Sequence, residues 1–181
     1  MLEITVALSP EGWDERTEQF VEAKTQKLQL EHSLVSISKW ESKWCKAFLS
    51  KAKKTDEEVL DYVRCMTITQ NVNPEVYNHL SIKNIEEINK YIEAPMTATV
   101  FSEEKGGKAN REVVTSELIY FWMIAQNIPS KYEKWHLNRL LTLIRICNIK
   151  NAPPKKMRRR DTLSRNAALN AARRKQLNTR G

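Results

Sequence analysis

The sequence predicts an α+β protein, a mainly α-helical single domain with a small antiparallel β-sheet and a basic helical C-terminal tail. Three observations predict this fold. Segments near the N-terminus alternate apolar and polar side chains, as half-buried strands do. Several segments within residues 33–92 and 116–148 repeat apolar side chains every three or four positions, as amphipathic helices do. Basic residues gather at the C-terminus, beyond the last periodic segment.

Three short strands are expected first: Leu2–Leu8, Thr17–Ala23 and Lys27–Glu31. Because only residues 24–26 separate the last two, we expect a hairpin there and an antiparallel meander overall. A second hairpin is expected from Thr97–Ser102 and Arg111–Thr115, which are rich in β-branched residues and flank a Gly-Gly pair.

Helices are expected at 33–50, 55–66, 73–79, 81–92, 116–126 and 132–148. Thr55 and Glu58 have the spacing of a capping box. Asn73-Pro74 combines an N-cap with a proline in the first turn. Leu118–Ala125 is apolar on every side, so we expect that helix to be central in the core.

The charge is divided unevenly along the chain. The 181 residues carry a net charge of +8, but residues 151–181 hold 10 of the 30 basic side chains and only one of the 22 acidic ones, Asp161. Residues 1–150 are therefore nearly neutral. We predict a globular domain over 1–150 and a basic, partly helical extension over 151–181, in which Asp161 caps a helix too poor in apolar side chains to form a core.

The residue types that bind metals or act as nucleophiles form no motif. The three histidines and three cysteines, His32, His79, His136, Cys45, Cys65 and Cys147, show no CxxC, HxxxH or HExxH spacing. No GxSxG or phosphate-binding loop is present. The sequence therefore favours a non-enzymatic protein without a cofactor. Its few, scattered cysteines favour a reducing cytosol, and its longest apolar run is too short to span a membrane.

Two groups of residues are candidates for binding a partner. Trp40, Trp44 and Phe48 share one helical stripe and form either an apolar partner-facing patch or part of the core. The basic candidates are Lys155, Lys156, Arg158, Arg159, Arg160, Arg173, Arg174 and Lys175. They would contact nucleic-acid phosphates or an acidic protein, or they would only make the extension soluble.

Five blocks of sequence point to a family of proteins: LQLEHSLVSISKWESKW (28–44), YIEAPMTATVF (91–101), ELIYFWMIAQNIP (117–129), WHLNRLLTLIRICNIKNAPPKKM (135–157) and LNAARRKQLNTRG (169–181). They resemble small proteins of tailed bacteriophages and prophages, in particular the tail assembly chaperones made beside the tape-measure protein. The resemblance implies a protein without catalytic residues that binds tape-measure helices and recruits tail-tube subunits.

We therefore expect a phage morphogenesis protein, a tail assembly chaperone, in the cytoplasm of the bacterial host. The alternative is a structural neck or tail component of the virion whose basic tail contacts DNA or a neighbouring subunit. A nucleic-acid-binding regulator is less favoured, because the body is nearly neutral and shows no helix-turn-helix pattern. Weak nucleic-acid contact through the tail is compatible with each of these functions.

Overall fold

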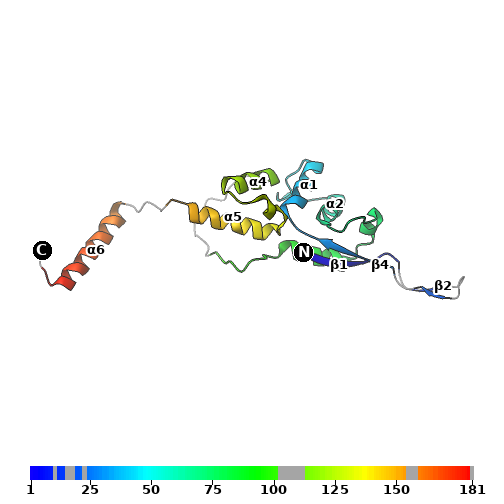
Figure 1. Cartoon of the computed structure of the whole chain (residues 1–181), viewed down its shortest axis with the longest axis horizontal. Coiled ribbons are helices and arrows are strands. Elements are labelled where there is room, and N and C mark those ends of the chain that lie inside the picture. The colour runs from blue at the N-terminus through cyan, green and yellow to red at the C-terminus, as the bar shows by residue number, and fades with distance from the viewer. Residues whose placement is uncertain (10–11, 15–18, 22–23, 102–112, 154–158, 180–181) are drawn as a thin grey trace. The chain divides into compact units, whose positions relative to one another are not determined.

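The structure is a computed structural model that describes residues 1–9, 12–14, 19–21, 24–101, 113–153 and 159–179 (Figure 1). The chain divides into two compact units, residues 1–148 and 149–181. The first unit combines helices with antiparallel strand pairs, which confirms the predicted mainly helical α+β fold.

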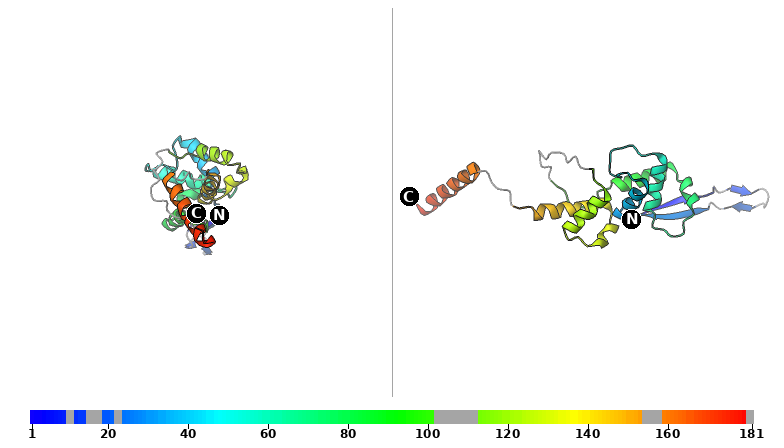
Figure 2. Two further views of the ribbon diagram at one scale, coloured as in Figure 1. Left: turned by 90° about the vertical axis from the view of Figure 1, so that its left-hand side faces the viewer. Right: turned by 90° about the horizontal axis from the view of Figure 1, so that it is seen from above.

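The strands pair differently from the predicted meander. β1 (Leu2–Ala7) pairs with β4 (Thr25–Leu30), and β2 (Gly12–Asp14) pairs with β3 (Gln19–Val21). The expected hairpin at 24–26 is wrong, because Thr25 and Gln26 belong to β4, and β4 lies beside β1 (Figure 2). Ile4 stands opposite Leu28 in this pair. Both side chains are fully buried, so the shared apolar face fixes the pairing.

The first helix, α1 (Leu34–Trp44), is shorter than predicted. Ser33 caps its start, as Ser36 and Ser33 satisfy each other's backbone N–H groups. Cys45 has a left-handed backbone with φ 51° and ends the helix, although the apolar period continues to Phe48. The Glu41 carboxylate accepts from the Phe48 N–H at 2.7 Å. That bond stabilises the loop that brings Phe48 back onto the core.

The next three elements have the predicted local signals. They are α2 (Asp56–Met66), the 3₁₀ helix η1 (Pro74–His79) and α3 (Ile82–Glu93). The capping box of Thr55 and Glu58 is present, and the Asn73 side chain accepts from the Glu75 N–H at 3.0 Å. These helix starts are set by neighbouring residues, which is why the sequence predicts them well.

The second hairpin is not found in the described residues. Residues 97–101 and 113–115 form no strands, and the rest of the predicted hairpin lies outside the described part of the chain. The Thr99 N–H bonds to the Thr97 hydroxyl instead of a strand partner, and the Val100 side chain is exposed. High β-propensity alone does not make a strand here, because none of the described residues pairs with residues 97–101 or 113–115.

The apolar helix α4 (Ser116–Ala125) lies at the edge of the domain, so the expectation of a central helix is wrong. Ile119 and Met123 are buried, whereas Phe121 is 61% exposed and Ile124 is 75% exposed. The Ser116 N–H at its start donates to the Glu41 carboxylate at 2.7 Å. This anchors α4 beside α1, which buries one face of the helix and leaves the other to solvent.

The helix predicted over 132–148 is two elements, η2 (Ser130–Lys134) and α5 (Leu137–Asn151). The backbone is extended at Trp135, and His136 forms an isolated β-bridge with Ser33. The Leu137 N–H donates to the His32 carbonyl at 2.7 Å. A contact distant in sequence therefore interrupts the helix.

The buried apolar side chains form one cluster to which the paired strands β1 and β4, helices α1 to α5 and η1 contribute. The second unit contains α6 (Arg159–Leu177), which has no buried residue. Asp161 lies in the first turn of α6 and is not its N-cap, because the helix begins three residues earlier than predicted.

Candidate partner-binding groove

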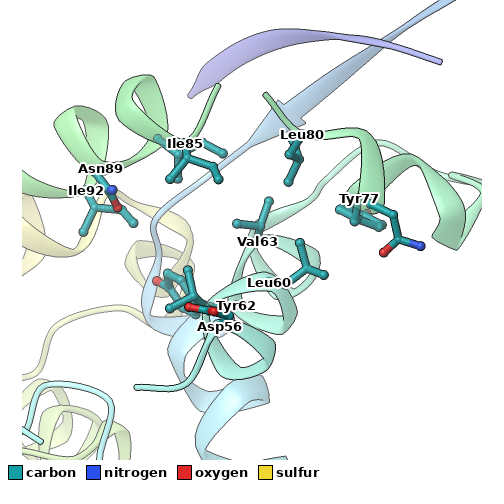
Figure 3. A pocket seen from close by; sticks show the side chains of 12 residues that line it. Asp56, Leu60, Tyr62, Val63, Tyr77, Leu80, Ile85, Asn89 and Ile92 are labelled. Atoms are coloured by element: carbon teal, nitrogen blue, oxygen red, sulfur yellow. The ribbon is translucent and has the colours of Figure 1, made fainter. Parts of the chain in front are cut away.

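A mostly apolar groove of about 490 Å³ lies between α2, η1 and α3. The residues that line it are Asp56, Val59, Leu60, Tyr62, Val63, Tyr77, Asn78, Leu80, Ile85, Ile88, Asn89 and Ile92. In Figure 3, Leu60 and Val63 of α2 and Leu80 point into the same space, and Ile85 faces it from α3.

The groove forms because α2 and α3 carry more apolar residues than the core covers. On α2, Tyr62 and Met66 are buried in the core, while Val59 is 40% exposed. Val59 has helical spacing with Tyr62 and Met66, which predicts burial of all three, and for Val59 that prediction is wrong. On α3, Ile88 is buried and Ile85 is 40% exposed. These two exposed side chains line the groove from opposite helices.

Acidic and amide side chains lie at the edge of the groove. Asp56 is the one charged residue among the described residues that line it, and Asn89 belongs both to the groove and to a second surface hollow. That hollow includes Glu86, Lys90 and Glu93. The lining of the groove therefore combines one carboxylate, Asp56, with an apolar floor. Such a surface suits a ligand with apolar side chains flanked by basic or neutral ones.

Hydrogen bonds hold the walls of the groove in place. The Tyr77 hydroxyl donates to the Thr67 hydroxyl at 3.0 Å. The Arg64 guanidinium lies 5.4 Å from the centre of the Tyr77 ring. The Tyr62 hydroxyl and His32 Nδ1 are 2.5 Å apart. The groove is thus preformed, which lowers the ordering cost of binding.

Tyr62 also connects the groove to a buried polar cluster made by Glu31, His32, Tyr62, Tyr91 and His136. The ring centres of His32 and His136 are 5.1 Å apart. His136 Nε2 lies 3.0 Å from the Tyr91 carbonyl oxygen. The Tyr91 hydroxyl donates to Glu31 at 2.7 Å, and the N-terminal ammonium pairs with the same carboxylate at 2.9 Å.

Burial keeps both imidazoles of this cluster neutral. Desolvation, and then the nearby His136, lowers the pKa of His32 to about 4. Desolvation also lowers the pKa of His136, against a smaller opposing effect of the Tyr91 carbonyl and Glu31. Burial raises the pKa of Tyr62 well above its usual value. Hydrogen bonds of this cluster join α2, α3, the segment just after β4 and the residue just before α5.

The sequence does not indicate this cluster, because its histidines belong to no motif. His32 and His136 are both buried. Their positions in the sequence give one signal: each lies just before an apolar helical stripe. The stripe begins at Leu34 after His32 and at Leu137 after His136. Which tyrosine or carboxylate meets each ring depends on the tertiary fold.

The predicted apolar patch is divided between core and surface. Trp40 is only 1% exposed, and its indole N–H donates to the Glu58 carbonyl at 2.8 Å. Trp40 is therefore a core residue and does not form part of a surface patch. Trp44 and Phe48 are partly buried against the core. The Trp44 indole N–H donates to Asp61 at 2.9 Å.

A pair of lysines neutralises the carboxylates around Trp40 and Trp44. Lys43 pairs with Asp61, and Lys46 pairs with Glu58. Burial disfavours the charged form of Asp61, but hydrogen bonds from Lys43 and Trp44 outweigh it and lower the pKa. The hydrogen bond from Lys46 lowers the pKa of Glu58. At neutral pH these carboxylates are therefore ionised and engaged in ion pairs with the two lysines.

The basic candidates lie on α6 where the structure describes them. Arg159, Arg160, Arg173, Arg174 and Lys175 are all exposed on that helix. Lys155, Lys156 and Arg158 lie outside the described residues.

Among the described residues, no group of three or more His, Cys, Asp or Glu side chains is placed to hold a metal ion. In the same part of the chain, no helix has the length and apolarity needed to cross a membrane. Comparisons of the chain with family models, with curated proteins and with solved structures find no match.

Proposed function

We propose that this protein is a non-enzymatic assembly factor that binds the apolar face of a partner helix in the groove between α2 and α3. The observation that carries the proposal is an open apolar groove with half-exposed Val59 and Ile85 on opposite walls. An amphipathic helix binds such a groove through apolar side chains spaced three or four residues apart.

The shape and chemistry of the groove favour a helix over a small polar ligand. Two helices and η1 form its walls, and apolar side chains dominate its lining. A small-molecule site usually adds several convergent polar groups to such a surface. Here Asp56, Asn78 and Asn89 are the polar residues besides the two tyrosines among the described lining residues.

The sequence resemblance to tail assembly chaperones suggests which protein the partner helix belongs to. In this proposal the ligand is an apolar helical segment of a phage tape-measure protein, and the protein acts in the bacterial host cytoplasm while the tail is built. Tail-tube subunits would be recruited by another surface. A transient binder needs an exposed apolar groove but no catalytic group, and the groove between α2 and α3 meets that need.

The test is binding of peptides from predicted tape-measure helices to the full chain, measured by fluorescence anisotropy. The double variant Val59→Asp, Ile85→Asp places charges on half-exposed wall positions. Because these carboxylates would be desolvated by a bound apolar helix, we expect affinity to fall at least about tenfold. The matched control is Ile124→Asp, which changes an exposed apolar residue on α4.

Equal affinities for the double variant and the wild type would overturn the groove as the binding site. Purified virions separate the chaperone from a structural component of the neck or tail. A chaperone is absent from the mature particle or present in traces. Stoichiometric amounts in the virion would overturn the chaperone proposal.

A further inference from the structure

The C-terminal helix α6 carries basic side chains on opposite sides of its axis. Arg159 and Arg160 lie in its first turn, and Arg173, Arg174 and Lys175 lie near its end. Successive residues of a helix point about 100° apart, so residues 173–175 alone cover more than half of the circumference. All five side chains are exposed.

Alanines occupy part of the middle of the helix, beside Leu163, Arg165 and Leu169. The segment between the two basic clusters includes Ala167, Ala168, Ala171 and Ala172. The clusters are about 20 Å apart along the axis at a rise of 1.5 Å per residue. The alanine-containing segment can therefore approach a binding partner closely, while the basic side chains at the two ends of the helix contact the partner on either side of that segment.

We propose that α6 binds duplex DNA by lying in the major groove, where its two basic clusters contact phosphates of both strands. The major groove is about 12 Å wide and admits an α-helix. Phosphates line the groove on both sides, so cations on opposite faces of one helix each find a partner. An acidic protein surface would contact one face of α6 and leave the remaining cations unpaired.

This inference concerns a different surface from the proposed groove between α2 and α3. Contacts to phosphates position a protein but read no bases, and α6 contains no aromatic side chain to stack on them. Binding is therefore expected to depend on salt and on duplex geometry more than on sequence.

The experiment measures binding of the full chain to a labelled DNA duplex of about 20 base pairs across a range of NaCl concentrations. Each phosphate contact adds about 0.9 to the slope of log affinity against log salt. The variant Arg173→Gln, Arg174→Gln, Lys175→Gln should lower the slope by nearly 3 and leave residual binding through Arg159 and Arg160.

A matched control removes three charges from the first unit. Lys39, Lys83 and Lys90 are exposed lysines on α1 and α3, and their change to Gln lowers the net charge of the chain by the same amount. We expect this control to keep most of the wild-type slope. Equal loss in the two variants would overturn the assignment to α6, because net charge alone would explain binding.

Two further probes test the groove geometry and the class of partner. An A-form RNA duplex of equal length has a deep, narrow major groove that side chains cannot read, so it should bind at least about fivefold more weakly. Equal binding of the RNA duplex would overturn the major-groove location. Polyglutamate competing as well as the DNA duplex, at equal charge concentration, would overturn nucleic acid as the partner in favour of an acidic protein. Absence of binding to DNA at low salt would overturn the proposal as a whole.

Discussion

Residues 1–148 and helix α6 use polar side chains in opposite ways. In the first unit, polar groups such as His32, His136 and Glu41 are buried and hydrogen-bonded to distant segments. In α6, none of the described side chains is buried. Polar groups in the first unit therefore define the fold, whereas those in α6 are exposed to solvent. Substitutions in the two regions should accordingly affect different measurements.

The largest effect is expected from Trp40→Ala. The change removes a fully buried indole and the hydrogen bond that its N–H donates to the Glu58 carbonyl. Truncation of a large buried aromatic residue costs about 3–5 kcal/mol. Urea unfolding monitored by far-UV circular dichroism measures the loss. Trp44→Ala is the comparison, and we expect a smaller loss because Trp44 is only partly buried. An equal loss would show that the partly buried Trp44 contributes as much to the unfolding free energy as the fully buried Trp40.

A pH effect of intermediate size should arise from His32. Its folded pKa of about 4 lies below the unfolded value of about 6.5. Between these values the unfolded state binds more protons, so stability falls as the pH is lowered. The loss due to His32 is about 2 kcal/mol at pH 5 relative to pH 7.5. Ionised Glu58 and Asp61, whose pKa values are lowered, should add losses mainly below pH 4.5.

Urea unfolding at pH 7.5, 6.5, 5.5 and 5.0 measures this dependence. His32→Asn should flatten the curve whatever its baseline stability. His79→Gln, which changes an exposed histidine, should leave the curve unchanged. A wild-type stability that does not change from pH 7.5 to pH 5.0 would contradict a neutral buried cluster.

The sequence predicts the features of this fold that depend on neighbouring residues better than those that depend on long-range contacts. The starts of α2, η1 and α3 follow from capping residues and one proline, all within three positions of the helix they begin. The end of α1 was missed because Cys45 takes a left-handed conformation without the glycine that usually signals it.

The candidate site was missed for a related reason. The sequence places apolar residues on α2 and α3 at helical spacing, but which of them another element covers is decided by the whole fold. Val59 and Ile85 have the same pattern as Met66 and Ile88. Only the tertiary arrangement separates the exposed pair from the buried pair. The basic tail was easier to predict, because its composition departs from the rest of the chain.

Smaller losses of stability are expected for substitutions on α4. Within its apolar run, Trp122 is partly buried and Phe121 is mostly exposed. Trp122 lies beside Leu141 and Val113 around a surface hollow and is partly buried. Trp122→Ala should therefore cost about 1–2 kcal/mol, less than a core truncation. Phe121→Ala should change the unfolding free energy by about 0.5 kcal/mol or less, since Phe121 is mostly exposed. Equal effects at the two positions would mean that α4 is covered on both faces in solution.

The smallest effect on stability should follow removal of the whole C-terminal extension after Asn151. This cut keeps all of α5, whose buried residues Leu137, Leu140 and Ile144 belong to the core. It removes α6, which buries none of its described residues. The unfolding free energy should therefore stay within about 1 kcal/mol of the full chain, as for changes confined to a surface.

The measurement is urea unfolding of the full and shortened chains under the same conditions, with DNA binding measured in parallel. Net charge falls from +8 to about −1 on truncation, so DNA binding should be lost even though the fold persists. A loss of several kcal/mol would contradict the separation of the two regions, because it would require α6 to pack on the first unit. Persistent DNA binding by the shortened chain would instead place the DNA contact on residues 1–151, which are nearly neutral. It would overturn the assignment of DNA binding to α6.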